Sequence, residues 1–368
     1  MVPIPGFHRS QPSPPPATIL SSWFPHIRLP LIISAPMLGV SNGALAAAVS
    51  KAGGLGVVPG GYDFSPGSAH LTALAAELAA ARAALGLADR TLTPLPLAVG
   101  LILCHGESAG RFADAALPLL QEHSPQAVWL FAPDPGADVD AQREIVELLR
   151  RSGFTVMIQV GTVGAARKAV EDGADVIVAQ GVDAGGHQFA RGAGVVSLVP
   201  EVRSMLDREF PGKRVVVVAA GGIVDGRGVA AALALGAEAA VMGTRFILSR
   251  ESLAPDYRRQ TITEAVDGGV STIKSTFHDD VQGTTLWPSL YDGRALIGKS
   301  YQDHAAGVSL EENATKFKEA KEQGDNSRMI TWSGTGVGLV NQDLPAGDIV
   351  REVREAAKKR IQEIQAYV

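Results

Sequence analysis

TVMIQVGTVGAARKAVEDGADVIVAQ, residues 155–180, is the stretch that decides the fold. It begins and ends with apolar runs, 155–160 and 176–180, in which polar and apolar residues do not alternate. Continuous apolar runs of this length are typical of parallel strands buried on both faces. Between the runs lies a helical pattern that ends at Gly173, and glycine is a common helix stop. The stretch therefore predicts a strand–helix–strand unit with parallel strands.

The same unit recurs along the chain. Apolar runs occupy residues 31–37, 55–58, 95–103, 127–132, 155–160, 176–180, 214–220 and 239–244. Helical patterns separate them at residues 43–53, 68–86, 108–123, 138–153, 161–173, 196–206 and 226–236. Strands in this number, alternating with helices, predict an α/β fold of the (β/α)8 TIM-barrel type. A doubly wound open sheet is the competing interpretation, but no dinucleotide-binding fingerprint follows the first strand.

The regular alternation predicts four segments. Residues 1–28 begin with a proline-rich stretch and are expected to form a tail. The barrel is expected to cover residues 29–269, and residues 270–345 are expected to form an appended lid or substrate subdomain. Within that subdomain, 271–277 and 284–290 resemble short extended pieces and 309–324 an exposed amphipathic helix. Residues 346–368 are expected to form a C-terminal helix.

Composition limits the function. The 368 residues carry a net charge of −5 and no basic run, so nucleic-acid binding has no electrostatic support. No apolar run reaches the roughly 20 residues of a membrane helix, and the N-terminus lacks the apolar core of a signal peptide. The single cysteine, Cys104, excludes an internal disulfide and agrees with a cytoplasmic location. The histidines show no metal-ligand spacing, so no metal site is expected.

Active sites of TIM barrels form at the carboxyl ends of the strands, and several features fall there. After the first strand, Ala35, Pro36 and Met37 make a turn whose free backbone groups are expected to face a ring edge. Gln159 ends the fifth strand, where it is either a ring contact or a satisfied core amide. The loops after strands seven and eight are rich in glycine, which favours phosphate binding by the backbone and one hydroxyl at Gly221, Gly222, Gly243 and Thr244.

The loop after strand six surrounds one histidine with glycines. Its sequence, AQGVDAGGHQFARGAG, spans residues 179–194. Glycines let a backbone approach a ligand closely, and histidine exchanges its proton near neutral pH. His187 is therefore the candidate catalytic or ligand-facing group of the site.

Taken together, these motifs resemble the nitronate monooxygenases, formerly called 2-nitropropane dioxygenases. The resemblance covers roughly residues 29–345 and is carried by residues 35–58, 159–162, 179–188, 219–252 and 332–339 together. Individual motifs of this set also resemble those of the flavin-dependent enoyl-ACP reductases and the NADH:quinone reductases. The family fold is a (β/α)8 barrel that binds FMN, and this agrees with the barrel and the phosphate loops predicted from the residues.

The resemblance also implies residue roles. His187 would be the base that takes the α-proton of a nitroalkane, and O2 would complete the oxidation to a carbonyl compound and nitrite. Two departures, Asp183 in place of a glutamate and 188–190 in place of a nearby glycine, affect the substrate more than the cofactor. An FMN-dependent NAD(P)H reductase of a quinone or enoyl thioester and a redox-inactive flavin-binding protein stay as alternatives. The implied flavin contacts are Ala35, Pro36, Met37, Gln159, Gly181, Gly186, Gly221, Gly222, Gly243 and Thr244.

Overall fold

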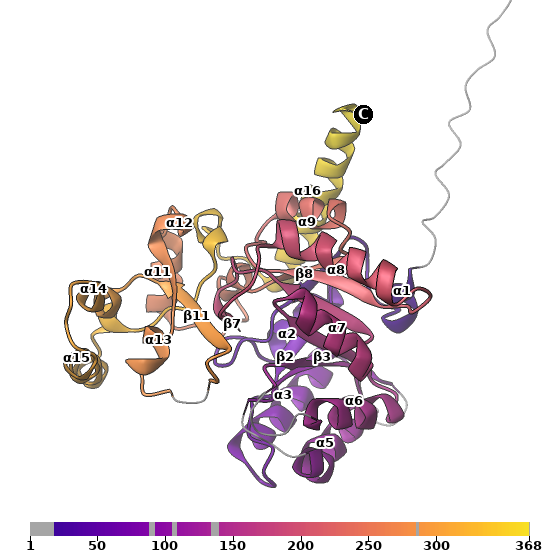
Figure 1. Cartoon of the computed structure of the whole chain (residues 1–368), viewed down its shortest axis with the longest axis horizontal. Helices are drawn as coiled ribbons and strands as arrows, with labels where there is room; N and C mark the ends of the chain where they lie inside the picture. Colours follow the sequence, from indigo (N-terminus) through magenta and orange to yellow (C-terminus); the bar gives the residue numbers. More distant parts are fainter. Residues whose placement is uncertain (1–17, 88–92, 105–108, 134–139, 285–286, 368) are drawn as a thin grey trace, which may run out of the picture.

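The computed structural model describes residues 18–87, 93–104, 109–133, 140–284 and 287–367 (Figure 1). Its main element is an 8-stranded parallel sheet in the order β1-β9-β8-β6-β5-β4-β3-β2. A parallel bridge between Ile33 and Leu55 joins the first strand to the second, so the sheet closes into a barrel. The predicted TIM barrel is confirmed, and the open-sheet interpretation is wrong. The strands are β1 (Leu31–Ser34), β2 (Gly56–Pro59), β3 (Leu95–Ile102), β4 (Pro125–Phe131), β5 (Thr155–Val160), β6 (Val176–Gln180), β8 (Val216–Ala220) and β9 (Ala239–Met242).

Helices surround the barrel, and several of them begin at a side chain that caps the first turn. Asn42, Thr162 and Asp225 each accept a hydrogen bond from a backbone N–H of the first helical turn. Gly86 and Gly173 end their helices in the left-handed conformation. The surrounding elements are α2 (Gly43–Lys51), α3 (Ala69–Leu85), α4 (Ala109–Arg111), the π-helix η1 (Phe112–Ala116), α5 (Leu117–His123), α6 (Ala141–Arg151), α7 (Val163–Asp172), α8 (Val195–Glu209) and α9 (Gly226–Ala234).

Apolar side chains fill both sides of the barrel wall. One cluster lies between the strands and the helices, and a second fills the barrel interior with Ile33, Trp129 and Val218 among its members. Leu20 on helix α1 (Ile19–Trp23) and Phe24 directly after it belong to the interior cluster. The tail expected over residues 1–28 is therefore wrong for its second part, because residues 18–24 fold against the barrel; residues 1–17 lie outside the described residues.

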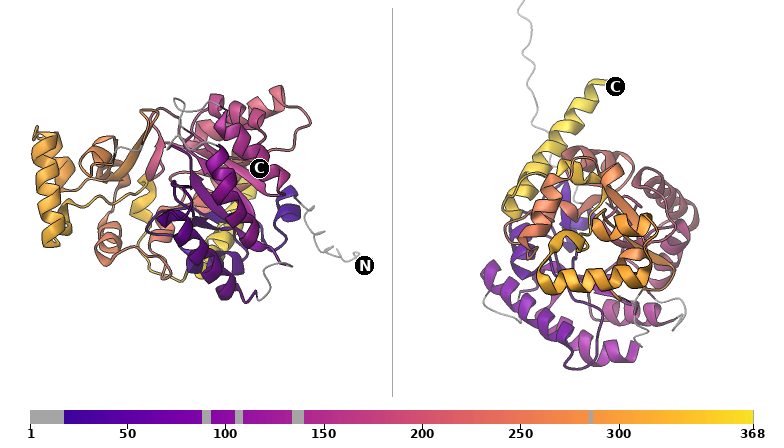
Figure 2. Two further views of the ribbon diagram at one scale, coloured as in Figure 1. Left: turned by 90° about the horizontal axis from the view of Figure 1, so that it is seen from below. Right: turned by 90° about the vertical axis from the view of Figure 1, so that its left-hand side faces the viewer.

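A smaller antiparallel sheet lies at the other end of the barrel from α1 (Figures 1 and 2). Its order is β10-β11-β7, and β7 comes from the segment between β6 and α8. The remaining helices on this side build a lobe that projects from the barrel. The elements are β7 (Gly186–Phe189), β10 (Thr272–Ser275), β11 (Tyr291–Leu296), α11 (Asp256–Glu264), α12 (Gly268–Ser271), α13 (Phe277–Asp280), α14 (Lys299–Ala305), α15 (Leu310–Gln323) and η2 (Asn326–Arg328).

The lobe matches the expected extended and helical pieces only in part. The extended piece at 271–277 contains β10, and the helix at 309–324 is α15. The piece expected at 284–290 is wrong in its described part, because Tyr291 N–H closes a turn onto Pro288 C=O and the strand begins only there. That 270–345 acts as a lid stays a prediction.

The chain then returns to the barrel. Residues 330–345 pass the end of β9 and its short helix α10 (Thr244–Ile247), and they contain η3 (Thr335–Leu339). Helix α16 (Ala346–Ile364), followed by η4 (Gln365–Tyr367), packs on α9 and α2. On α16, the buried Arg354 donates hydrogen bonds to the carbonyl groups of Pro30, Ala52 and Gly53. No helix among the described residues is long and apolar enough to cross a membrane.

Candidate active site

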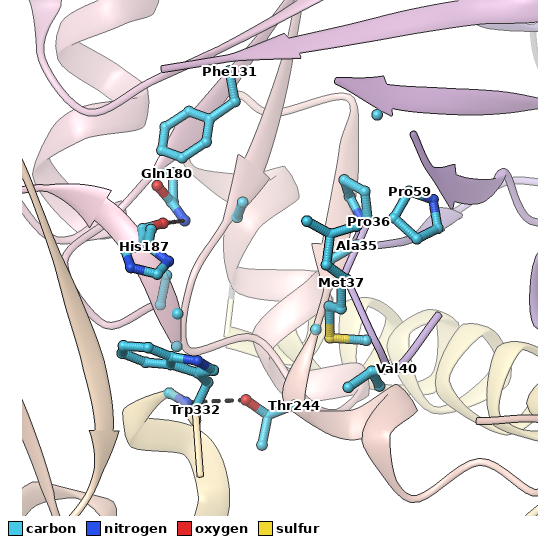
Figure 3. A pocket seen from close by; sticks show the side chains of 18 of the residues that line it. Ala35, Pro36, Met37, Val40, Pro59, Phe131, Gln180, His187, Thr244 and Trp332 are labelled. Atoms are coloured by element: carbon cyan, nitrogen blue, oxygen red, sulfur yellow. Dashed lines mark hydrogen bonds between the residues drawn. The ribbon is translucent and has the colours of Figure 1, made fainter. Parts of the chain in front are cut away.

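A cavity of about 400 Å³ opens at the carboxyl ends of the barrel strands, beneath the smaller sheet. Figure 3 shows His187, Gln180 and Trp332 on one wall, facing Ala35, Pro36 and Met37 on the other. Every site residue predicted from the sequence lines this cavity except Gly181. The lining members of that set are Ala35, Pro36, Met37, Gln159, Gly186, His187, Gly221, Gly222, Gly243 and Thr244.

Gly181 serves a different purpose. A Cβ atom on it would lie 2.6 Å from the backbone nitrogen of Val195, where α8 begins. The glycine therefore lets the loop after β6 press against α8, which is a packing requirement. The sequence pattern could not separate this from a close approach to a ligand, since both require the absence of a side chain.

The turn after β1 presents a flat apolar surface to the cavity. Pro36 packs over Gly100, where a Cβ atom would lie 2.5 Å from the proline Cβ. The Ala35 N–H donates to the carbonyl of Met242, and the Ala35 carbonyl accepts a 2.9 Å hydrogen bond from the Ser41 hydroxyl. The expectation that the backbone groups of Ala35 are free is wrong. This wall can contact the apolar face of a ring.

The loop after β8 forms a backbone cradle. Gly221 and Gly222 have φ angles of +104° and +72°, and residues that carry a side chain rarely adopt this backbone conformation. A Cβ atom on Gly222 would lie 2.9 Å from the Cβ atom of Asp183. Within the part of the chain that the structure describes, the N–H groups of Gly222 and Gly243 have no hydrogen-bond acceptor. Two unpaired donors at neighbouring strand ends can bind an anion.

Thr244 lies beside this cradle, and its hydroxyl oxygen accepts a 3.0 Å hydrogen bond from the N–H of Gly334 (Figure 3). The hydroxyl proton stays available to a ligand oxygen. Arg258 on α11 also lines the cavity, and its buried Nε has no partner among the described residues. Helix α11 packs against η3, which follows Gly334 directly, so Arg258 comes from the element next to the Thr244 contact.

A chain of amide hydrogen bonds links the barrel interior to the smaller sheet. Trp129 Nε1–H donates to Gln159 Oε1 at 3.1 Å, and Gln159 Nε2–H donates to Gln180 Oε1 at 2.8 Å. Gln180 Nε2–H then donates to the backbone carbonyl of His187 at 3.2 Å. The two interpretations of Gln159 are therefore compatible, because this satisfied core amide also lines the cavity.

His187 lies on strand β7 rather than in a loop, which corrects the sequence-based expectation. Its Nε2 atom is 3.0 Å from both carboxylate oxygens of Asp279 on α13. The Trp287 indole stacks on the imidazole with ring centroids 3.8 Å apart, and Trp332 lies against it at 4.7 Å. Sequence reasoning missed these three neighbours, because they approach His187 only through the pairing of β7 with β11.

Part of the segment 332–339, including Gly334, also lines the cavity beside His187. The Thr335 N–H donates to the Asp183 carbonyl at 3.0 Å, and a Cβ atom on Gly185 would lie 2.4 Å from the Gly334 nitrogen. The glycines let two backbone segments, far apart in sequence, touch directly beside His187. No group of three His, Cys, Asp or Glu side chains that could hold a metal ion occurs among the described residues.

The chain is similar to several known proteins. Residues 135–355 match the nitronate monooxygenase family. A nitronate monooxygenase of Neurospora crassa is 61% identical over 95% of both chains. Among solved structures, nitroalkane oxidase from Streptomyces ansochromogenes is 28% identical with a TM-score of 0.71, covering 94% of this chain and 100% of that one. FabK from Thermotoga maritima is 25% identical with a TM-score of 0.71, covering 95% and 98%.

Proposed function

Because this chain belongs to the nitronate monooxygenase family, which comprises flavin-dependent oxidoreductases, we propose that it binds FMN and oxidises alkyl nitronates and nitroalkanes with O2. The products are a carbonyl compound and nitrite. One observation carries the proposal. The cavity that holds the backbone cradle of Gly222 and Gly243 also holds the imidazole of His187.

The cavity residues fit FMN. The N–H groups of Gly222 and Gly243, the Thr244 hydroxyl and the unpaired Nε of Arg258 are donors that suit a phosphate dianion. The flat wall at Pro36 suits one face of a flavin ring, and Gln159 has a second Nε2 proton to donate to a ring edge. Bound FMN supplies the electron-transfer chemistry, which no side chain here can supply.

The side chains of the protein prepare the substrate. A neutral nitroalkane has its acidic hydrogen on carbon, so a base must lie within hydrogen-bond reach of that atom. His187 accepts this proton and becomes imidazolium, while the electron pair of the C–H bond moves into the nitro group to form the nitronate. Trp287 and Trp332 contact the imidazole, whose side chain is 17% exposed, and so limit the access of water to it. A nitronate supplied as the anion needs no such step.

The decisive experiment is anaerobic. Nitroethane, ethyl nitronate and NADPH are each added to the purified yellow protein without O2, and the flavin absorbance is followed. Bleaching by the nitro compounds and not by NADPH supports the proposal. Bleaching by NADPH alone supports the alternative, a reductase of a quinone or enoyl thioester on the same barrel.

We propose a cytoplasmic location for the enzyme. The chain contains one cysteine, Cys104, and its side chain is buried. A protein that relies on no disulfide is suited to a reducing compartment. Cell fractionation with an antibody against the chain tests this, and recovery in a secreted fraction contradicts it.

A further inference from the structure

His187 has two ring nitrogens, and a neutral imidazole can accept a substrate proton only at the one without hydrogen. We infer that Asp279 holds His187 as the Nε2–H tautomer, so that Nδ1 is the atom that takes the α-proton of the substrate. The inference rests on the proposed function for the proton-transfer step, but the tautomer can be measured without any turnover.

The contact with Asp279 determines the tautomer. Both carboxylate oxygens lie 3.0 Å from Nε2, and an ionised carboxylate can only accept hydrogen bonds. Nε2 must therefore carry the hydrogen in this contact. The Asp279 side chain is 9% exposed, so water competes little for it. No hydrogen bond joins Nδ1 to any residue that the structure describes, and His187 lines the cavity.

The ring is fixed as well as oriented. Trp287 stacks on it with an angle of 13° between the planes, and Trp332 covers it at 51°. Opposite His187 on β11 is Gly293, where a Cβ atom would lie 2.4 Å from Cζ3 of Trp332. The glycine leaves room for this indole. With two indoles in contact with it and a carboxylate at Nε2, the imidazole cannot exchange the positions of its two nitrogens without displacing these neighbours.

Asp279 also acts on the charge of His187, as the charged groups around the pair show. Burial lowers the pKa of His278, the next residue, which disfavours a positive charge on that ring beside Asp279. Asp292 on β11 pairs with Lys274, so its charge is compensated. Asp279 is therefore the carboxylate that stabilises the imidazolium formed when His187 accepts a proton. Asp279 also lines the cavity, but its carboxylate acts through the Nε2 atom of His187 in this scheme, and so it is a positioning residue.

The first test is spectroscopic and uses the FMN-loaded protein with ¹⁵N-labelled histidine. The ¹⁵N shift of a protonated ring nitrogen differs strongly from that of an unprotonated one, and a His187→Asn sample identifies the signals. We expect protonated Nε2 and unprotonated Nδ1 at neutral pH in the wild type. Asp279→Asn is expected to give a mixture of tautomers, because an amide can donate as well as accept. Protonated Nδ1 in the wild type overturns the inference.

The second test is kinetic. Asp279→Asn is expected to lower kcat with nitroethane by roughly 10²-fold, within the range attributed to a positioned base, and to change the rate with ethyl nitronate less than about threefold. Its deuterium isotope effect with 1,1-dideuteronitroethane is expected to rise. Asp280→Asn is the matched control, because Asp280 is the exposed neighbour on the same helix.

The outcomes separate the two proposals. A variant that keeps FMN and the nitronate rate has folded, so a selective loss with nitroethane supports the role of Asp279. An Asp279→Asn enzyme that oxidises nitroethane at the wild-type rate overturns it. A wild type that oxidises neither compound refutes the proposed function, and in that case the NMR result still decides the tautomer.

Discussion

Gly222→Ala is expected to release FMN before it unfolds the protein. The φ angle of +72° costs an L-residue about 1–2 kcal/mol. The new Cβ atom would lie 2.9 Å from the Asp183 Cβ atom, and overpacking of this kind costs about 1–3 kcal/mol. The backbone can relieve both costs by moving, but the N–H of Gly222 then leaves the phosphate position. If the whole cost of about 2–5 kcal/mol appears in the flavin affinity, the Kd rises about 30- to 4,000-fold.

The assay is titration of deflavinated protein with FMN, followed by the quenching of flavin fluorescence. Gly212→Ala is the matched control, because Gly212 has a φ angle of +86° and a Cβ atom there meets nothing within 4 Å. Both variants are expected to lose thermal stability through the backbone conformation, whereas only Gly222→Ala loses flavin affinity. A wild-type Kd in Gly222→Ala would refute the assignment of this loop to the phosphate.

Three further predictions concern other residues. His187→Asn is expected to keep FMN and to slow nitroethane oxidation by about 10²–10⁴-fold, with a much smaller effect on ethyl nitronate; equal losses on both substrates, with flavin retained, contradict a base. Arg258→Gln is expected to raise the Kd for FMN about 10- to 100-fold, since a hydrogen bond to a charged group contributes about 1.5–3 kcal/mol. The Kd for riboflavin, which has no phosphate, is expected to stay unchanged. Arg227→Gln, which removes an exposed ion pair, is the control. Burial lowers the pKa of His26, so below about pH 6.5 the unfolded chain binds a proton that the folded protein does not, and stability falls as the pH falls. His26→Gln can still donate a hydrogen bond to the Gly54 carbonyl, and its melting temperature is expected to fall less between pH 7.5 and 5.5 than that of the wild type. An equal fall in both proteins argues against this linkage.

The barrel could be predicted because its strands carry a local signal. The runs at 155–160 and 176–180 coincide with β5 and β6, since strands buried on both faces need apolar residues throughout. The smaller sheet has no such signal. Strand β7 is four residues long, and β11 contains Asp292 and Arg294 in a segment whose burial alternates. Short, half-polar strands of this kind resemble loops in a sequence.

The site, like the fold, has parts that a local sequence pattern indicates and parts that it does not. Glycines and a histidine at strand ends mark the cavity, because a barrel brings those ends together whatever the loops contain. Asp279 is 92 residues from His187 in the sequence, and no local pattern connects them. The contact exists only because β10, β11 and β7 pair side by side, and that pairing could not be predicted from the residues. His187 could therefore be proposed as a site residue from the sequence, whereas its neighbour Asp279 could not.

The contact between Arg354 and the start of the barrel has a consequence for biosynthesis. Arg354 on α16 satisfies the carbonyl of Pro30, which was synthesised 324 residues earlier. At about 5–20 residues per second, a ribosome needs roughly 15–65 s to cover that distance. Until α16 is synthesised, it cannot cover the apolar surface of α2 or, once residues 226–234 have been made, that of α9. All eight barrel strands are therefore synthesised before α16, but the outer surface that α16 covers is completed only when this last helix has emerged.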